Sequence, residues 1–268
     1  MPLSSHASRW LVALILGPVL IWIITAGPPL AFFLVVTLAG LVAWWEFASV
    51  FLAPNLTGLK IIGLAGTLLI MAGARMSGAF HLAALFPALG AGFAYFVLKY
   101  EKIPSIMDQA GRFALGLTYA VLLLSFFIPI FSLPYGRVWV LFTLLVTFLS
   151  DTSAYYAGRT WGRRPLHAAV SPKKTMEGLW GGVIGGGLAG AVTGVFLPPV
   201  TWYEAGGVAL FLSLWGVMGD LFESVLKRSA GVKDSGGILM GHGGLLDRVD
   251  ALVFNVPLVY IFAWIVSP

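Results

Sequence analysis

The sequence predicts an all-α integral membrane protein. Of its 268 residues, 59% are hydrophobic and only 10% are charged, whereas soluble domains carry about 25% charged residues. Apolar stretches of about 20 residues, long enough to cross the bilayer core as a helix, recur along the whole chain. Because little sequence lies between these stretches, we expect any active site to be built from loops and helix ends.

About nine segments have the length and hydropathy of a transmembrane helix. The first follows a short polar stretch, as the core of a signal peptide does, but it lacks a clear cleavage site and is expected to be a retained helix. The expected spans cover residues 10–26, 29–53, 59–76, 79–98, 113–134, 137–157, 178–198, 206–223 and 251–267.

The basic residues are distributed unevenly between the two sides of these spans. Of the 16 lysines and arginines, all but Arg75 and Arg137 fall on the side of the N-terminus. Because cytoplasmic loops carry the excess of positive charge, we expect the N-terminus in the cytoplasm and the C-terminus outside. The net charge of +5 follows from this topology, and we expect no nucleic-acid partner.

Polar residues are sparse in the first half of the chain and crowded in the second. We therefore expect residues 1–135 to form an N-terminal transmembrane scaffold and residues 136–268 to carry an active site on the cytoplasmic face. The chain contains no cysteine, so a metal ion would have to be held by oxygen or imidazole ligands.

A stripe of glycines marks the segment 178–198. A glycine recurs at every fourth residue, which leaves one helix face without side chains and lets a neighbouring helix approach closely. Packing within one chain is the simpler interpretation, and a homodimer seam is the alternative. The stripe consists of Gly178, Gly182, Gly186, Gly190 and Gly194.

The first of four polar stretches is "SDTSAYYAGR", residues 150–159. Asp151 lies inside a predicted span, where a carboxylate is costly and indicates a functional site by default. Asp151 is expected either to contact a ligand or to pair with one of the arginines that follow it.

The second stretch is "SPKKTMEG", residues 171–178. Pro172 is expected to begin a turn or helix, and in a loop Lys173 and Lys174 could both reach one polyanion. The alternative is that the two lysines only attract anionic lipid headgroups.

The third stretch is "GVMGDLFESVLKR", residues 216–228. Helical spacing places Asp220, Ser224 and Lys227 on one face, with Glu223 beside them. A plain salt-bridge ladder would not need a carboxylate as deep as Asp220. The two glycines of this stretch thin the helix and are expected to leave room for a ligand or ion.

The fourth stretch is "KDSGGILMGHGGLLDRVD", residues 233–250. Its glycine-rich loop could present backbone N–H groups to phosphates. Asp247 and Asp250 lie in the first turn of the last span, where either could merely cap the helix. Because Arg248 and His242 lie in the same short segment, a ligand site is favoured instead.

The four stretches together point to phosphate chemistry at a membrane surface. Carboxylates surrounded by lysine and arginine are typical of Mg²⁺ sites that take part of their ligands from substrate phosphates. The residues therefore predict a membrane enzyme that acts on a nucleotide or polyphosphate and a lipid.

The segment "SVLKRSAGVKDSGGILMGHGGLLDRVD", residues 224–250, closely resembles the signature of phosphatidate cytidylyltransferases, also called CDP-diacylglycerol synthases. The stretches 150–159 and 171–178 match further family segments in the same order. The resemblance covers the C-terminal half well and the N-terminal half only in hydropathy. One departure is Met240, where the family usually has proline before Gly-His.

This resemblance implies a reaction of CTP with phosphatidic acid that gives CDP-diacylglycerol and pyrophosphate. It also implies Mg²⁺ held by Asp220 and Asp247, a possible K⁺ beside it, and a homodimer among the lipids of an inner (cytoplasmic) membrane of the bacterial type. Lys227 and Arg248 are then expected to act on the reacting phosphates, with Glu223 and Asp250 orienting the metal ligands. The expected substrate-binding residues are Asp151, Lys173, Lys174, Ser224, Arg228, Lys233, His242, Gly243 and Gly244.

Two other functions compete with this one. A CTP-dependent lipid-alcohol kinase would share the nucleotide site, but it must deprotonate a hydroxyl group and so needs a base such as His242. A transporter is less favoured, because its ionisable groups would lie at mid-membrane and not at helix ends.

Overall fold

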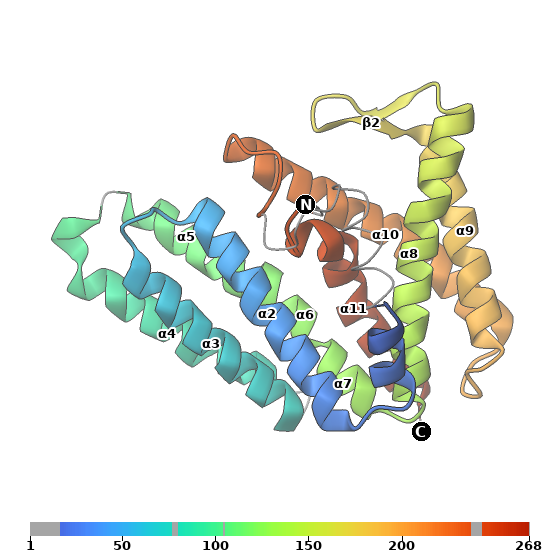
Figure 1. Cartoon of the computed structure of the whole chain (residues 1–268), viewed down its shortest axis with the longest axis horizontal. Helices are drawn as coiled ribbons and strands as arrows, with labels where there is room; N and C mark the ends of the chain where they lie inside the picture. The colour runs from blue at the N-terminus through green and yellow to red at the C-terminus, as the bar shows by residue number, and fades with distance from the viewer. Residues whose placement is uncertain (1–16, 77–79, 104, 237–242, 268) are drawn as a thin grey trace, which may run out of the picture. The chain divides into compact units, whose positions relative to one another are not determined.

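The computed structural model describes residues 17–76, 80–103, 105–236 and 243–267, which form helices joined by short connections and one small β-hairpin (Figure 1). Seven helical segments of this part of the chain are long and apolar enough to cross a membrane, which confirms the all-helical membrane class. They are α2 (Pro29–Phe51), α3 (Thr57–Met76), α4 (Phe80–Leu98), the run Ile106–Ser132, α8 (Gly136–Trp161), α10 (Trp202–Ser229) and α11 (Leu246–Val266).

The run Ile106–Ser132 is interrupted twice along its length. It comprises α5 (Ile106–Gly116), a π-helical turn (Leu117–Leu122), α6 (Leu123–Ser125) and α7 (Phe127–Ser132), and a 3₁₀ turn, Tyr100–Lys102, precedes it.

Two of the nine expected spans are not among these seven. Residues 17–25 are helical, but the rest of the expected span 10–26 lies outside the described residues. The expected span 178–198 forms α9 (Met176–Gly194), whose many glycines lower its mean hydropathy. The number nine and the orientation of the termini therefore stay predictions.

The chain divides into two compact units, Met1–Pro129 with Asp234–Arg248, and Ile130–Lys233 with Val249–Pro268. We call them unit 1 and unit 2. The first boundary falls close to the expected division after residue 135, but the segment 234–248, which carries Asp247, groups with the N-terminal unit. The expectation that the chemistry belongs to the C-terminal half stays a prediction.

Unit 1 is held together by aromatic rings that pack against glycines of neighbouring helices. A side chain at Gly63 of α3 would overlap the Trp44 ring of α2, and one at Gly92 of α4 would overlap the Phe113 ring of α5. Trp44 and Phe113 themselves meet edge to face, with ring centroids 5.4 Å apart. Such close packing is expected where lipid replaces water and apolar burial alone does not hold helices together.

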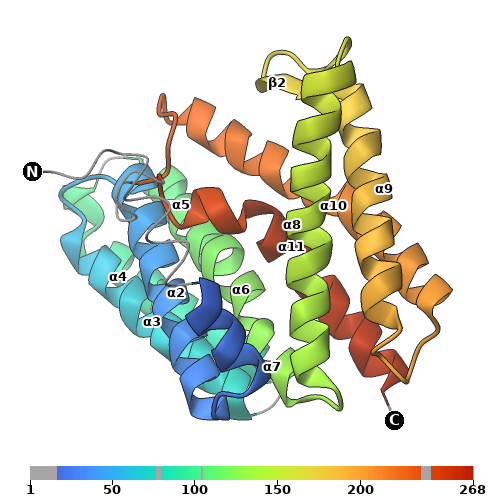
Figure 2. The same cartoon turned by 45° about the vertical axis from the view of Figure 1, so that its right-hand side comes forward.

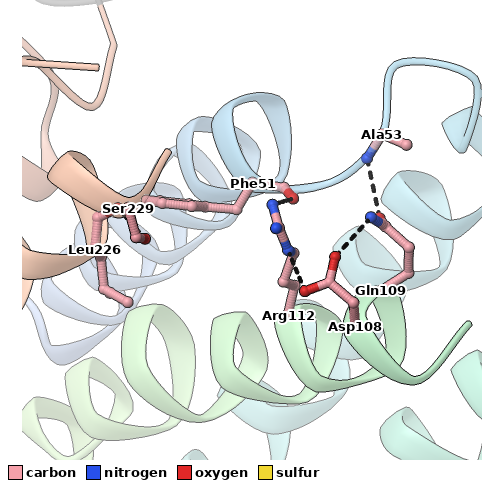
Figure 3. Close-up of polar contacts among 7 residues, drawn as sticks. All are labelled: Phe51, Ala53, Asp108, Gln109, Arg112, Leu226 and Ser229. Atoms are coloured by element: carbon pink, nitrogen blue, oxygen red, sulfur yellow. Dashed lines mark hydrogen bonds and ion pairs between the residues drawn. The ribbon is translucent and has the colours of Figure 1, made fainter. Parts of the chain in front are cut away.

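The C-terminus of α2 is fixed by the N-terminal turns of α5 (Figure 3). The Arg112 guanidinium donates to the Phe51 carbonyl oxygen at 2.9 Å and to Asp108 at 3.0 Å. The Ala53 N–H donates to the Gln109 side chain at 3.1 Å. A cation at the carboxyl end of a helix is favourable because the last carbonyl groups lack partners within the helix.

In unit 2 the glycine stripe packs within the chain. Gly178 and Gly182 lie against α8, whereas Gly190 and Gly194 lie against Ala209 and Ala205 of α10. Both views show α8 and α9 side by side (Figures 1 and 2). The interpretation as internal packing is confirmed. The alternative of a homodimer seam along this stripe is wrong, because α8 and α10 already fill the space beside it.

This packing predicts that a single added methyl group destabilises unit 2. In Gly190→Ala the new methyl group would overlap the Ala209 methyl group and lie 2.9 Å from the Ala205 carbonyl oxygen. We expect a loss of about 1–3 kcal/mol, measured as a lower thermal midpoint in detergent. The control is Gly207→Ala on α10, where nothing lies within 4 Å. Equal midpoints for the two variants would contradict the packing described here.

Candidate active site

Four carboxylates of unit 2 gather from three helices. Asp151 comes from α8, Asp220 and Glu223 from α10, and Asp250 from α11, and the negative charges of the other three act on Asp250. The position of α11 against α8 is fixed by a buried hydrogen bond from the Asn255 side-chain amide to Thr147, 3.0 Å long. Carboxylates this close repel one another unless cations lie among them.

Two lysines supply part of that positive charge. Lys174 forms an ion pair with Asp220, and the two side chains are 27% and 30% exposed, respectively. Lys227 lies 3.1 Å from Glu223, one turn along α10, and this pair is more buried, at 14% and 3% exposed. Four carboxylates and two ammonium groups leave a formal charge of −2 among the six side chains, which one divalent cation would balance.

Lys174 reaches Asp220 from a β-hairpin and not from a loop. Strands β1 (Pro165–His167) and β2 (Ser171–Thr175) pair antiparallel, at one end of α8 and α9 (Figure 1). The expected turn or helix after Ser171 is therefore wrong. Successive side chains of a strand point to opposite faces, and accordingly Lys173 is exposed while Lys174 is half-buried.

The hairpin is joined to α9 by hydrogen bonds from backbone N–H groups to side-chain oxygens. The Thr175 hydroxyl group accepts from the Gly178 N–H at 3.1 Å and caps the helix. The Glu177 carboxylate accepts from the N–H groups of Arg163 and Arg164 at 3.0 and 3.2 Å. The Arg163 bond is the largest of the effects that lower the pKa of Glu177 below its usual value of 4.5.

This junction predicts a stability that depends on acid pH. Because the pKa of Glu177 is lower in the folded state, its stabilising contribution is fully present above pH 4.5 and is lost as the pH falls through the lowered value. We expect the thermal midpoint of the wild type to fall toward that of Glu177→Gln between about pH 5 and pH 3. A constant difference between the two proteins over this range would contradict the assignment.

Gly216 and Gly219 of α10 serve helix packing. A side chain at Gly219 would meet the Asp250 carbonyl oxygen and the Phe254 ring, and one at Gly216 would meet Asn255. The expectation that these glycines leave room for a ligand or ion is wrong, because α11 occupies the space beside them.

In unit 1 the Asp247 carboxylate holds the glycine-rich segment in place. Its Oδ2 atom accepts from the N–H groups of Ser235 at 3.0 Å and Gly244 at 2.9 Å, at the start of α11. Gly243 adopts φ +80°, which a residue with a side chain rarely does. Asp247 thus holds the segment that precedes α11, and both the helix-cap alternative and its role as a metal ligand stay predictions.

The family follows from a comparison with known proteins. The sequence profile described as "Cytidylyltransferase family" matches residues 7–266, almost the whole chain. The chain belongs to the cytidylyltransferase family.

Several bacterial relatives of the chain carry the name phosphatidate cytidylyltransferase. The Bacillus subtilis protein is 38% identical over 57% of this chain and 58% of its own length. The Synechocystis protein is 35% identical over 69% of this chain and 72% of its own length. The Brucella melitensis protein is 34% identical over 97% of this chain and 94% of its own length. In the Bacillus alignment the chain thus spans a little over half of the relative's length.

The remaining predicted site residues lie in several places. Asp151 is exposed, and the charged groups that act on it are Asp220 and Lys174 and not the expected arginines. Ser224 is half-buried on α10. The exposed cations are Arg228, Lys233 and Arg248. His242 and Met240 lie outside the described residues, so the substrate-binding role of His242 stays a prediction.

One buried carboxylate was not among the predicted site residues. Glu46 lies in α2, is 2% exposed and accepts a hydrogen bond from the Leu246 N–H at 3.0 Å. The signal that could have found it is its place inside an apolar span, where an ionisable residue indicates function by default.

Proposed function

We propose that this protein transfers the cytidylyl group of CTP to phosphatidic acid, giving CDP-diacylglycerol and pyrophosphate. The observation that carries the proposal is the match of the cytidylyltransferase family to residues 7–266. The names of the relatives supply the lipid substrate. The mixed carboxylate and ammonium cluster of unit 2 has the charge pattern that such a substrate pair requires.

The residues of unit 2 fit a Mg²⁺ ion in their chemistry. Mg²⁺ prefers oxygen ligands and commonly takes one or two carboxylates together with substrate phosphates. Among the described residues, no three Asp, Glu or His side chains are placed to hold a metal together, so phosphate and water would complete its coordination. We propose Asp220 and, from the family resemblance, Asp247 as its protein ligands, with K⁺ as a possible second ion.

The chemistry needs charge neutralisation and alignment more than a base. A phosphate monoester has a second pKa near 6, so the phosphatidic acid headgroup is largely dianionic at pH 7. One of its oxygens attacks the α-phosphorus of CTP, a new P–O bond forms, and the bond to the β-phosphate oxygen breaks. Pyrophosphate leaves with that electron pair, and no proton has to be removed from the nucleophile.

The cationic side chains would hold two polyanions near each other. When bound, Mg²⁺ supplies positive charge to the triphosphate and to the leaving pyrophosphate. Lys174 and Lys227 are held in unit 2 by Asp220 and Glu223, and they can neutralise phosphate oxygens from there. Preorganised cations of this kind usually supply the largest share of phosphoryl-transfer catalysis.

The cellular setting is part of the proposal. The distribution of basic residues supports an inner-membrane protein with its N-terminus and active site in the cytoplasm, where CTP is dissolved. A homodimer stays a proposal from the family resemblance, and it would have to use a surface other than the glycine stripe of α9.

The proposal is tested by incubating purified protein with CTP, Mg²⁺ and phosphatidic acid in mixed micelles. We expect pyrophosphate and a cytidine-containing lipid in equal amounts, and neither product when the lipid is diacylglycerol. Release of CDP with diacylglycerol as the lipid, in place of pyrophosphate with phosphatidic acid, would favour the kinase alternative, which the family match disfavours.

A further inference from the structure

The buried Glu46 lies directly beneath the glycine-rich segment of unit 1. The Glu46 side chain is 2% exposed and that of Ser235 is 1% exposed. An added Cβ at Gly236 would lie 2.8 Å from Glu46 Oε1, and one at Gly244 would lie 2.8 Å from Glu46 Oε2. A side chain at either position would therefore displace the Glu46 carboxylate from where it lies.

Glu46 also supplies a missing partner at the start of α11. The first N–H groups of a helix have no acceptor within the helix. Leu246, the first residue of α11, donates its N–H to Glu46 Oε2 at 3.0 Å, across 200 residues of sequence. A negative charge at this end of a helix is favoured by the helix dipole.

The two carboxylates, Glu46 and Asp247, both bind backbone N–H groups around the start of α11. Asp247 binds the N–H groups of Ser235 and Gly244, while Glu46 binds that of the residue immediately before Asp247. The backbone that sets the direction of the Asp247 side chain is thus fixed from two sides.

Glu46 is itself held on a rigid support. It lies five residues before the end of α2, and that end is fixed by the hydrogen bond from Arg112 to the Phe51 carbonyl oxygen (Figure 3). A carboxylate anchored in this way can position a neighbouring side chain more accurately than a residue on a loop.

We propose that Glu46 is a positioning residue for Asp247, which acts by holding the first turn of α11. The proposal rests on the proposed function, in which Asp247 is a ligand of Mg²⁺. Glu46 touches neither substrate nor metal. It determines how well Asp247 is preorganised for the ion, and loss of such supporting contacts typically weakens metal affinity 10–100-fold.

The test compares three substitutions of Glu46 in the full-length protein. Glu46→Gln keeps a carbonyl oxygen at the same reach, Glu46→Asp keeps the charge but is one methylene shorter, and Glu46→Ala removes both. Thr37→Val serves as the control, because it alters a buried polar side chain on the same helix.

Two measurements are made on each variant. Hydrogen exchange of a peptide covering residues 243–247 reports on the Leu246 and Gly244 amides without any need for activity. The Mg²⁺ concentration that gives half-maximal cytidylyl transfer reports on the metal site. We expect faster exchange and an about 10–100-fold higher Mg²⁺ requirement in Glu46→Asp and Glu46→Ala, smaller effects in Glu46→Gln, and none in Thr37→Val.

Two outcomes would overturn the proposal. Unchanged exchange in Glu46→Asp would show that Glu46 does not hold the turn. Faster exchange with an unchanged Mg²⁺ requirement would reduce Glu46 to a purely structural role. Should Glu46→Ala fail to fold, the comparison of Glu46→Gln with Glu46→Asp still decides. The proposal predicts the larger change in exchange and Mg²⁺ requirement for Glu46→Asp, whereas a role of charge alone predicts the larger change for Glu46→Gln. A wild type that is inactive on phosphatidic acid would refute the proposed function, while the exchange data would still test the contact.

Discussion

Asp220→Asn is expected to lower turnover by about 10²–10³-fold, the effect typical of removing one preorganised group that stabilises charge in a transition state. The carboxylate pairs with Lys174 and belongs to the cluster with a formal charge of −2 in unit 2. Asparagine keeps the shape of the side chain but removes one negative charge, so both the divalent cation and Lys174 lose part of what holds them.

Steady-state kinetics over a range of Mg²⁺ concentrations check this prediction. Glu101→Gln, which makes the same carboxylate-to-amide change at an exposed turn, should be indistinguishable from the wild type. Near-normal turnover of Asp220→Asn at saturating Mg²⁺ would show that Asp220 is not a metal ligand.

Asp247→Asn should also lose most of its activity, about 10²-fold or more, while the protein remains folded. The asparagine carbonyl oxygen can still accept from the N–H groups of Ser235 and Gly244, as Asp247 Oδ2 does. The two hydrogen bonds are thus kept and only the negative charge is lost. Asp247→Ala removes both, and we expect lower thermal stability in addition to lost activity.

The pair of substitutions separates the two roles of Asp247. If the carboxylate only held the segment before α11 through these hydrogen bonds, Asp247→Asn would retain nearly full activity and Asp247→Ala alone would be impaired. Thermal midpoints and turnover numbers measured on the same preparations are sufficient to distinguish the two cases.

Hydropathy and charge predicted the helical membrane class because both depend on composition over about 20 residues. Seven of the expected spans have a counterpart among the membrane-spanning helices. The glycine stripe of α9 was predictable for the same local reason, since a four-residue repeat in a helix makes one continuous face. The partners of that face, α8 and α10, required the tertiary structure.

The hairpin 165–175 could not be predicted in this way. Its sequence lacks the alternation of apolar and polar residues that marks a strand, and its second strand is held by pairing and by the Glu177 contacts with Arg163 and Arg164. This matters for the site, because the side chains of Lys173 and Lys174 point to opposite faces of the strand.

The site itself was predictable where its residues lie close in sequence. The spacing of Asp220, Glu223 and Lys227 fixes their common place on α10. The Glu46 contact with Leu246 joins residues 200 positions apart, and no local pattern indicates it. The role of Gly216 and Gly219 was misjudged because a glycine signals close approach without identifying what approaches.

The most direct test of the proposed function is to supply phosphatidic acid and CTP labelled with ³²P at either the α- or the γ-phosphate. Cytidylyl transfer predicts that the α-label enters the chloroform-soluble product and the γ-label leaves as pyrophosphate, and that Asp220→Asn slows both by about 10²–10³-fold. Entry of the γ-label into the lipid, with the α-label left in CDP, would contradict the proposed function.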